Sequence, residues 1–260
     1  MKIDLGKTGL LEFCGPDAVR FLNGQITQDV RKVLGTGESL PSCVIDAKGK
    51  LQFRIWLTEG DSPGAVWVLC EESQTEELEL RLTRYLIADD VEVKDRSGEF
   101  FISHLAEKPE TGGLIRASKR LDFKGWDVFS GEPLTDAMDA GELERYRIEN
   151  GIPRWGVELK EGMLPPEAGL DITDISYNKG CYIGQEVISR IKSAGKVNRR
   201  LVQFEFTEDV AEGGELLDDE GKVCGEVTSV SGSYGLGFIK RGKENSESYF
   251  LHGTPAEILL

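Results

Sequence analysis

Apolar and polar residues alternate over several short stretches in the first half of the chain, which is typical of strands that bury one face. The clearest is a hairpin over 44–57, with 46–49 as its turn. Helical spacing of apolar residues follows Gly15-Pro16-Asp17, up to about Gly24, and recurs at 76–87. Further strands are expected at 65–70, 91–93 and 100–105. This order, with mostly hairpin-length links, predicts an α+β layer with helices on one face of an antiparallel sheet.

The pattern starts again after a loop at 107–113 that is rich in proline, glycine and charge. Strands are expected at 114–117 and 126–129, and a helix at 139–150 that Gly151 closes. Later strand signals, separated by turns, lie at 201–206, 222–230, 235–239 and 256–260. This last block of about 60 residues predicts a small β-barrel or sandwich.

The charge balance limits the partners of the chain. Its 260 residues include 31 Lys+Arg and 46 Asp+Glu, which gives a formal charge of −15. Such a field repels nucleic acid and anionic membranes, so direct contact with either is not expected, and an anionic ligand must meet a local basic patch. The longest apolar run, 65–70, is far shorter than a membrane span, and the N-terminus lacks the pattern of a secretory signal. A cytoplasmic protein is expected.

The histidines and cysteines predict no metal site. The five cysteines are widely spaced without a C-x-x-C, and neither of the two histidines lies in an H-E-x-x-H motif. His104 falls in the alternating stretch 100–105, where a structural role in a strand is expected. Phosphate-loop and nucleophile-elbow motifs are also absent from the sequence.

The first candidate for chemistry is Glu149, which the pattern places in the last turn of a helix. The helix macrodipole disfavours an acid there, and breaches of local rules are enriched at functional sites. Its carboxylate could accept two parallel N–H bonds from a flat heterocycle, with Trp155 supplying an aromatic face. The alternative is that Glu149 pairs with Arg147 or Arg154 and that Trp155 belongs to the core.

The second candidate is the thiol of Cys181, in the stretch Asn178-Lys179-Gly180-Cys181-Tyr182-Ile183-Gly184-Gln185-Glu186. An apolar stripe that follows predicts a helix, so Cys181 lies just before a helix N-terminus. That position and the adjacent Lys179 favour a thiolate, whereas the other four cysteines lie in strand or turn contexts. The alternative is a small apolar residue in a tight turn.

The third candidate is a basic stretch at 187–203 that contains no acidic residue: Arg190, Lys192, Lys196, Arg199 and Arg200. Within so acidic a chain, it would suit an anionic carboxylate or phosphate tail. The alternative is a solvated face without a ligand.

These residues carry a resemblance to a known family. The eight residues from Lys179 to Glu186 are similar to the signature K-G-C-[FY]-x-G-Q-E of the YgfZ family of folate-binding proteins. The stretches 147–153 and 164–170 resemble the block before that signature in YgfZ and in the related aminomethyltransferases, the T-proteins of the glycine cleavage system. The stretch 15–30 resembles the N-terminal segment of members of this family. The resemblance covers nearly the whole chain.

The resemblance implies a ring of three small domains around a central folate channel, two of them α+β (ferredoxin-like) layers and the last a β-barrel. The implied boundaries are 1–45 plus 112–192 for the folate-binding domain, 46–111 for the inserted domain and 196–260 for the barrel. It also implies that Glu149 holds the pterin of tetrahydrofolate, or of a one-carbon derivative, and that Trp155 lines the pocket. The remaining implied roles are ligand binding by Lys179, contact with the anionic tail by Arg190 and Lys192, and a functional thiol at Cys181.

The function implied is assistance to the assembly or repair of iron–sulfur proteins, without classical turnover. The implied partners are folate and iron–sulfur proteins or their assembly factors, with a link to tRNA-modifying iron–sulfur enzymes. A folate-dependent aminomethyl or one-carbon transferase is the main alternative. T-proteins carry an acidic residue a few positions past the turn at Gly49, and the stretch 50–55 has none here. A third alternative is a protein-interaction scaffold that binds no folate.

Overall fold

The computed structural model describes residues 1–110, 113–246 and 248–259. These residues form two compact units, an N-terminal unit of 1–138 with 173–189 and a C-terminal unit of 139–172 with the described residues from 190 onward. Two residues of the expected loop at 107–113, and the last residue of the expected strand at 256–260, lie outside the described residues. The three-domain division given above stays a prediction. None of the helices in the described part of the chain is long and apolar enough to cross a membrane.

The N-terminal unit is built on one nine-stranded sheet with the order β1-β7-β9-β8-β3-β4-β5-β2-β6. Its pairs are antiparallel except β3 with β8, which is parallel. The strands are β1 (Lys2–Gly6), β2 (Thr8–Cys14), β3 (Glu38–Ile45), β4 (Leu51–Glu59), β5 (Val66–Glu71), β6 (Glu92–Asp95), β7 (Phe101–Leu105), β8 (Leu114–Ser118) and β9 (Gly125–Ser130).

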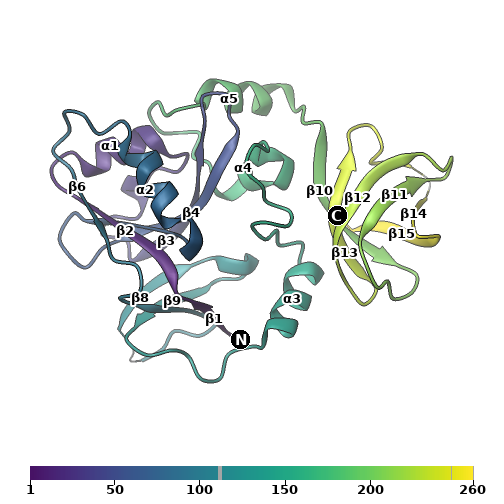
Figure 1. Ribbon diagram of the computed structural model, residues 1–260, viewed down its shortest axis with the longest axis horizontal. Coiled ribbons are helices and arrows are strands. Elements are labelled where there is room, and N and C mark those ends of the chain that lie inside the picture. Colours follow the sequence, from purple (N-terminus) through teal and green to yellow (C-terminus); the bar gives the residue numbers. More distant parts are fainter. Residues whose placement is uncertain (111–112, 247, 260) are drawn as a thin grey trace. The chain divides into compact units, whose positions relative to one another are not determined.

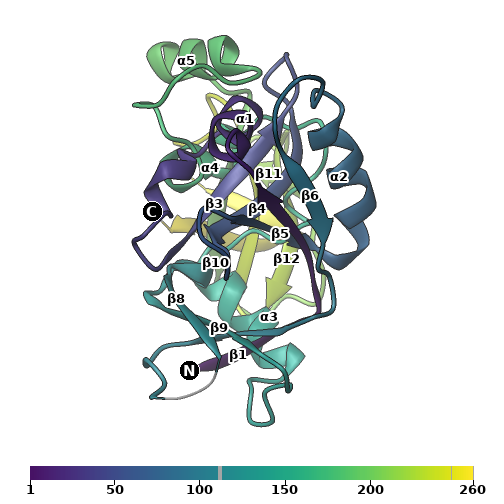
Figure 2. The same cartoon turned by 90° about the vertical axis from the view of Figure 1, so that its left-hand side faces the viewer.

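Two helices, α1 (Ala18–Gln25) and α2 (Thr75–Thr83), cover one face of this sheet, as Figures 1 and 2 show. Alternation along the strands decides which residues meet them. On β2, Leu11 and Phe13 face the helices, whereas Leu10 faces a second core that includes Trp67. Short 3₁₀ turns complete the unit at Val30–Lys32, Glu72–Gln74 and Arg120–Asp122. Helices on one face of a largely antiparallel sheet confirm the predicted α+β class.

The helix expected at 76–87 ends earlier, at Thr83. Its apolar spacing continues to Leu86, which still packs against the core. However, the N–H of Leu86 donates to the carbonyl of Thr83 at 2.8 Å, three residues back, so the chain tightens into a turn. Ile87 then points into solvent with 90% of its surface exposed.

The C-terminal unit contains a closed six-stranded barrel of order β10-β13-β12-β11-β14-β15, drawn in green to yellow in Figure 1. Closure leaves no free sheet edge, and the small core inside includes Phe204, Leu216 and Ile239. The predicted barrel is confirmed. Its strands are β10 (Arg199–Phe206), β11 (Gly214–Asp218), β12 (Val223–Ser231), β13 (Tyr234–Lys240), β14 (Tyr249–Leu251) and β15 (Thr254–Leu259).

Helices precede the barrel in sequence. The expected helix at 139–150 is α3 (Ala140–Glu149), which starts with a capping box between Asp139 and Glu142. A 3₁₀ turn (Pro165–Ala168), α4 (Leu170–Thr173) and α5 (Gln185–Ala194) follow. Both α4 and α5 contain a boundary between the two units.

Candidate functional site

The loop at 178–184, which we call the signature loop, is tied by three hydrogen bonds to the end of α1 and the segment after it, and a fourth bond lies just before the loop. Just before the loop, the N–H of Ser176 donates to the carbonyl of Thr27 at 3.0 Å. The Lys179 ammonium donates to the carbonyls of Ile26 and Gln28, at 2.9 and 2.6 Å. Finally, the N–H of Ile183 donates to the carbonyl of Gly24 at 3.2 Å. Segments about 150 residues apart in sequence therefore hold each other in place.

The glycines of this region allow close approach. Gly184 has φ +83°, and a Cβ there would lie 2.3 Å from the carbonyl oxygen of Asp46. Gly49, in the hairpin turn, has φ +74° and faces the side chain of Val187, where a Cβ would lie 3.0 Å from a methyl carbon. A side chain at either position would push the start of α5 off the hairpin. The two glycines therefore fix where the signature loop ends.

Lys179 lies inside the N-terminal unit, with only 9% of its surface exposed. Burial lowers the pKa of its ammonium to about 7, against a smaller opposing effect of Asp29. The folded chain therefore bears a cost for keeping this group charged.

This burial predicts a pH-dependent stability. Between about pH 7 and the unfolded-chain pKa of roughly 10.4, the unfolded state binds one more proton at Lys179 than the folded state does. The free energy of unfolding is therefore expected to rise with pH across this window, and the contribution is lost as the pH falls to 7. Urea unfolding at several pH values should show this rise in the wild type relative to Lys179→Met. Equal slopes for the two proteins would contradict it, and Lys48→Met, at an exposed site, is the matched control.

Cys181 is exposed at the outer part of the signature loop, as a reactive thiol requires. Cys43, Cys70 and Cys224 are buried and Cys14 is half-buried. Burial raises the pKa of all four of these thiols, that of Cys70 to about 12. Cys181 is thus the cysteine best placed to meet a partner. Among the described residues, no group of three or more His, Cys, Asp or Glu side chains could hold a metal ion.

A buried ion pair beside the loop could not be predicted from the sequence. Arg54 on β4 donates through Nε and Nη2 to the carboxylate of Asp174, at 2.8 and 3.2 Å. The Asp174 side chain is fully buried and also accepts from the hydroxyl of Thr173 at 2.6 Å. Arg54 occupies a polar position in the alternating strand β4, and such a position is typical of a side chain that faces solvent. The stretch where T-proteins carry an acid therefore holds a cation here.

In the C-terminal unit, Glu149 is the last residue of α3, as predicted, and its side chain is 28% exposed. Its partner is neither Arg147 nor Arg154, because the Nε of Arg145 donates to its Oε1 at 2.6 Å. Arg145 itself is largely exposed. An exposed i, i+4 ion pair contributes little stability, so it leaves the Glu149 carboxylate open to exchange for a ligand.

Arg147 and Glu158 form the buried centre of the C-terminal unit. Arg147 Nη1 lies 3.0 Å from Glu158 Oε2, which also accepts from the N–H of Arg154 at 3.0 Å. The hydroxyls of Thr228 and Ser229 donate to Oε1 at 2.9 and 2.6 Å. The register of β12 shifts between Val227 and Ser229, which lets two adjacent hydroxyls reach one carboxylate. This network, invisible in the sequence, joins the end of α3 and the following loop to the barrel.

The remaining predicted residues differ in their burial and in their contacts. Trp155 is half-buried in the loop that Glu158 anchors. Arg190 and Lys192 are exposed on the second half of α5, as are Lys196 and Arg200 after it. Arg199 instead pairs with Glu167 at 3.1 Å and stacks over Phe238. Within the C-terminal unit the structure thus places Glu149 and Trp155 on one helix and its adjoining loop, while Lys179 and Cys181 share the signature loop of the N-terminal unit.

His104 is fully buried on β7, where its Nδ1 lies 2.9 Å from Asp127 Oδ1. The other oxygen of Asp127 accepts from Arg120 Nε at 2.8 Å. Burial opposes ionisation of Asp127, but Arg120 and His104 outweigh it, so the pKa of this carboxyl is lowered. These contacts agree with the predicted structural role of His104.

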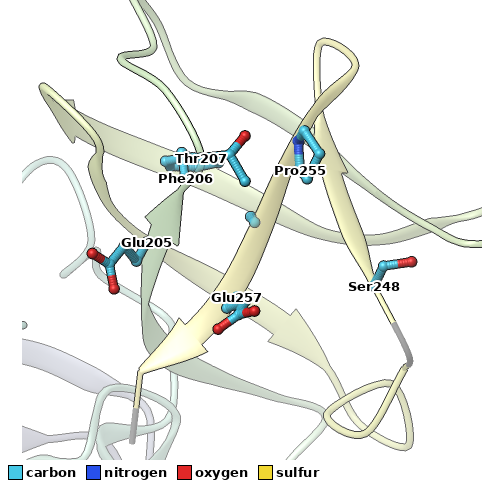
Figure 3. Close-up of a pocket in the computed structure, with 7 residues that line it drawn as sticks. Glu205, Phe206, Thr207, Ser248, Pro255 and Glu257 are labelled. Carbon is cyan, nitrogen blue, oxygen red and sulfur yellow. The ribbon is translucent and has the colours of Figure 1, made fainter.

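A shallow cavity of about 420 Å³ opens on the barrel between the end of β10 and β15 (Figure 3). The carboxylates of Glu205 and Glu257 flank it, and Phe206 and Pro255 line it. It contains none of the residues that the sequence singled out.

Comparison with known proteins finds relatives along nearly the whole chain. Residues 198–257 match the family model of the CAF17 C-terminal beta-barrel domain. The human mitochondrial iron–sulfur cluster assembly factor IBA57 is 24% identical, over 98% of this chain and 81% of that protein. The tRNA-modifying protein YgfZ of Cronobacter sakazakii is 23% identical, over 97% of this chain and 91% of that protein. These matches confirm the resemblance to the YgfZ family.

A solved structure agrees with the fold. The aminomethyltransferase T of the glycine cleavage system from Bartonella henselae superposes with a TM-score of 0.81. The match covers 100% of this chain and 84% of that protein at 16% identity. At that identity the likeness shows a shared fold.

Proposed function

We propose that this chain, a relative of the YgfZ and IBA57 proteins, binds tetrahydrofolate and assists the assembly or repair of iron–sulfur proteins, including enzymes that modify tRNA. The observation that carries the proposal is the signature loop, which is held by buried contacts and leaves Cys181 exposed. A thiol presented in this way suits brief contact with a cluster or with a client protein. One cysteine cannot supply the usual four thiolate ligands, so the cluster is cargo that the client shares.

In this proposal, residues of the C-terminal unit form the folate site. The Glu149 carboxylate can accept two parallel N–H bonds from the amino-amide edge of a pterin, once Arg145 releases it. Trp155 supplies an aromatic face on the neighbouring loop. The exposed cations Arg190 and Lys192 suit the carboxylates of the glutamate tail. The partly exposed carboxylate and these cations are donors and acceptors of the kind that folate requires.

Arg54 counts against the transferase alternative. An acid in this stretch would favour the positive charge that develops on an aminomethyl group, whereas the Arg54–Asp174 pair has no net charge and supplies no such field. Asp174 fixes Arg54 in place through two hydrogen bonds, so the cation is a built part of the unit. The function supported best is therefore assistance to iron–sulfur proteins without one-carbon transfer.

The experiment combines folate binding with client activity. Calorimetric titration of tetrahydrofolate into the wild type should give saturable binding. In cells that lack this protein, the wild-type gene should restore the activity of an iron–sulfur enzyme that modifies tRNA, and Cys181→Ser should not. Cys14→Ser, at a half-buried cysteine, is the control and should restore activity fully.

Two outcomes would overturn the proposal. Saturable turnover with glycine-cleavage components, retained in Cys181→Ser, would identify a one-carbon transferase. An absence of heat at tetrahydrofolate concentrations that cover weak micromolar binding would leave a scaffold without folate.

A further inference from the structure

Lys179 is a buried cation without a carboxylate partner. No ion pair involving it occurs within the described ranges of the chain, and its nearest acid, Asp29, is already bound by Arg31 at 2.9 and 2.7 Å. Arg31 and Lys32 add positive charge nearby. A buried, uncompensated ammonium is costly, and an apolar side chain of similar length would avoid that cost. A lysine at this position is therefore expected to have a role that offsets its cost in stability.

The contacts of the Lys179 ammonium lie within the unit. Two point to the carbonyl oxygens of Ile26 and Gln28, and the ring of Tyr182 lies 5.2 Å from Nζ on a further side. Tyr182 is itself buried. Because these contacts lie inside the unit, an effect of Lys179 on function passes through the loop.

Hydrogen bonds hold the signature loop at two points, one on each side of Cys181, and we call these points the tethers. Lys179 ties its first part to the segment 26–28, and the N–H of Ile183 ties its last part to the carbonyl of Gly24. Cys181 lies midway between these tethers, with one residue separating it from each, and is exposed. Release of one tether would free the thiol to sample many positions.

We propose that Lys179 is the positioning residue of Cys181: its bonds to Ile26 and Gln28 hold the signature loop in the single conformation that presents the thiol to an iron–sulfur client. This inference rests on the proposed function, in which Cys181 is the functional thiol. Presenting a thiol without the loss of loop entropy on each encounter favours productive contact.

The test replaces Lys179 by methionine, an unbranched side chain that is one atom shorter, which removes both bonds. Hydrogen exchange should show faster exchange of the Ile183 amide, by about tenfold or more, because the loop opens more often. Client activity in cells should fall by about tenfold, while the affinity for tetrahydrofolate should stay within roughly twofold of the wild type. Lys179→Arg, which can still donate to both carbonyls, should recover part of the client activity. Lys48→Met is the matched control and should change none of these readouts.

The proposal is overturned if folded Lys179→Met keeps wild-type client activity or wild-type protection of the Ile183 amide. If the variant does not fold, the wild type provides the test. The ε-carbon resonance of Lys179, followed by NMR against pH, should titrate near 7 because the amine is buried. Titration above 10 would place the amine in solvent and overturn the proposal.

Failure of this inference differs from failure of the proposed function. A wild type that binds no tetrahydrofolate, or a fully active Cys181→Ser, contradicts the proposed function whatever Lys179 does. Full activity of Lys179→Met beside an inactive Cys181→Ser contradicts the positioning role alone.

Discussion

Replacing Glu158 by alanine is expected to destabilise the C-terminal unit by about 3 kcal/mol, because the buried Arg147 guanidinium loses one of its two carboxylate partners and keeps only Glu144. The side chains of Arg147 and Glu158 are almost fully buried, at 4% and 0% exposure. Removal of the carboxylate also leaves the hydroxyl of Ser229 and the N–H of Arg154 without their acceptor, whereas the hydroxyl of Thr228 keeps the carbonyl of Leu236. Urea unfolding followed by far-UV circular dichroism would measure the loss, because three of the four tryptophans lie in the N-terminal unit and would dominate a fluorescence signal.

Two further variants show whether the loss of the buried ion pair is the cause. Arg147→Met combined with Glu158→Leu removes both charges and should recover much of the stability lost in Glu158→Ala. Glu220→Ala breaks the exposed pair with Lys222 on the same barrel and should leave the unfolding midpoint unchanged. A Glu158→Ala protein as stable as Glu220→Ala would show that the network contributes little.

The network also bears on the proposed ligand site. It anchors the loop of Trp155 to the barrel and holds the end of the helix that carries Glu149. Folate binding is therefore expected to weaken in Glu158→Ala even below the denaturation midpoint, because the two residues lose their fixed positions.

The sequence predicted those helices and strands whose boundaries depend on residues close together in the chain. The capping box at Asp139 and the glycine after the helix gave α3 nearly to the residue, since each satisfies backbone groups within a few positions. The alternation after the turn at 46–49 gave β4 for the same reason. The strands β1 and β2 did not stand out, because β2 is apolar on both faces at Leu10 and Leu11 and shows little alternation. In the barrel, β11 and β14 are short and were missed.

The residues of the candidate site likewise include some that the sequence predicted and some that it did not. Cys181 and Glu149 stood out because each breaks a local rule or lies in a specific motif. Arg54 with Asp174 and Arg147 with Glu158 are pairs distant in sequence or across a loop, and a single sequence carries no signal that joins them. The motif identified Lys179 as a candidate, but the sequence did not show that its side chain points inward. That orientation depends on acceptor carbonyls about 150 residues away.

Replacing Glu149 by alanine is expected to lower the affinity for tetrahydrofolate by about 100-fold or more. The proposed site loses two hydrogen bonds to a charged group, each worth roughly 1.5–3 kcal/mol, and every 1.4 kcal/mol or so is a factor of ten in affinity. Glu149→Gln keeps one acceptor oxygen and should fall between the alanine variant and the wild type. Calorimetric titration at constant salt measures all three, and an unchanged dissociation constant in Glu149→Ala would remove Glu149 from the site.

Arg145→Gln provides the matched control, because it breaks the same ion pair from the other side. In the free protein Arg145 occupies one oxygen of Glu149, at 2.6 Å, so the pterin must displace it. Without that competitor, tetrahydrofolate should bind as tightly as in the wild type or more tightly. Opposite effects of the two substitutions would identify the carboxylate as the contact, whereas equal losses would mean that the ion pair acts only by holding the end of α3.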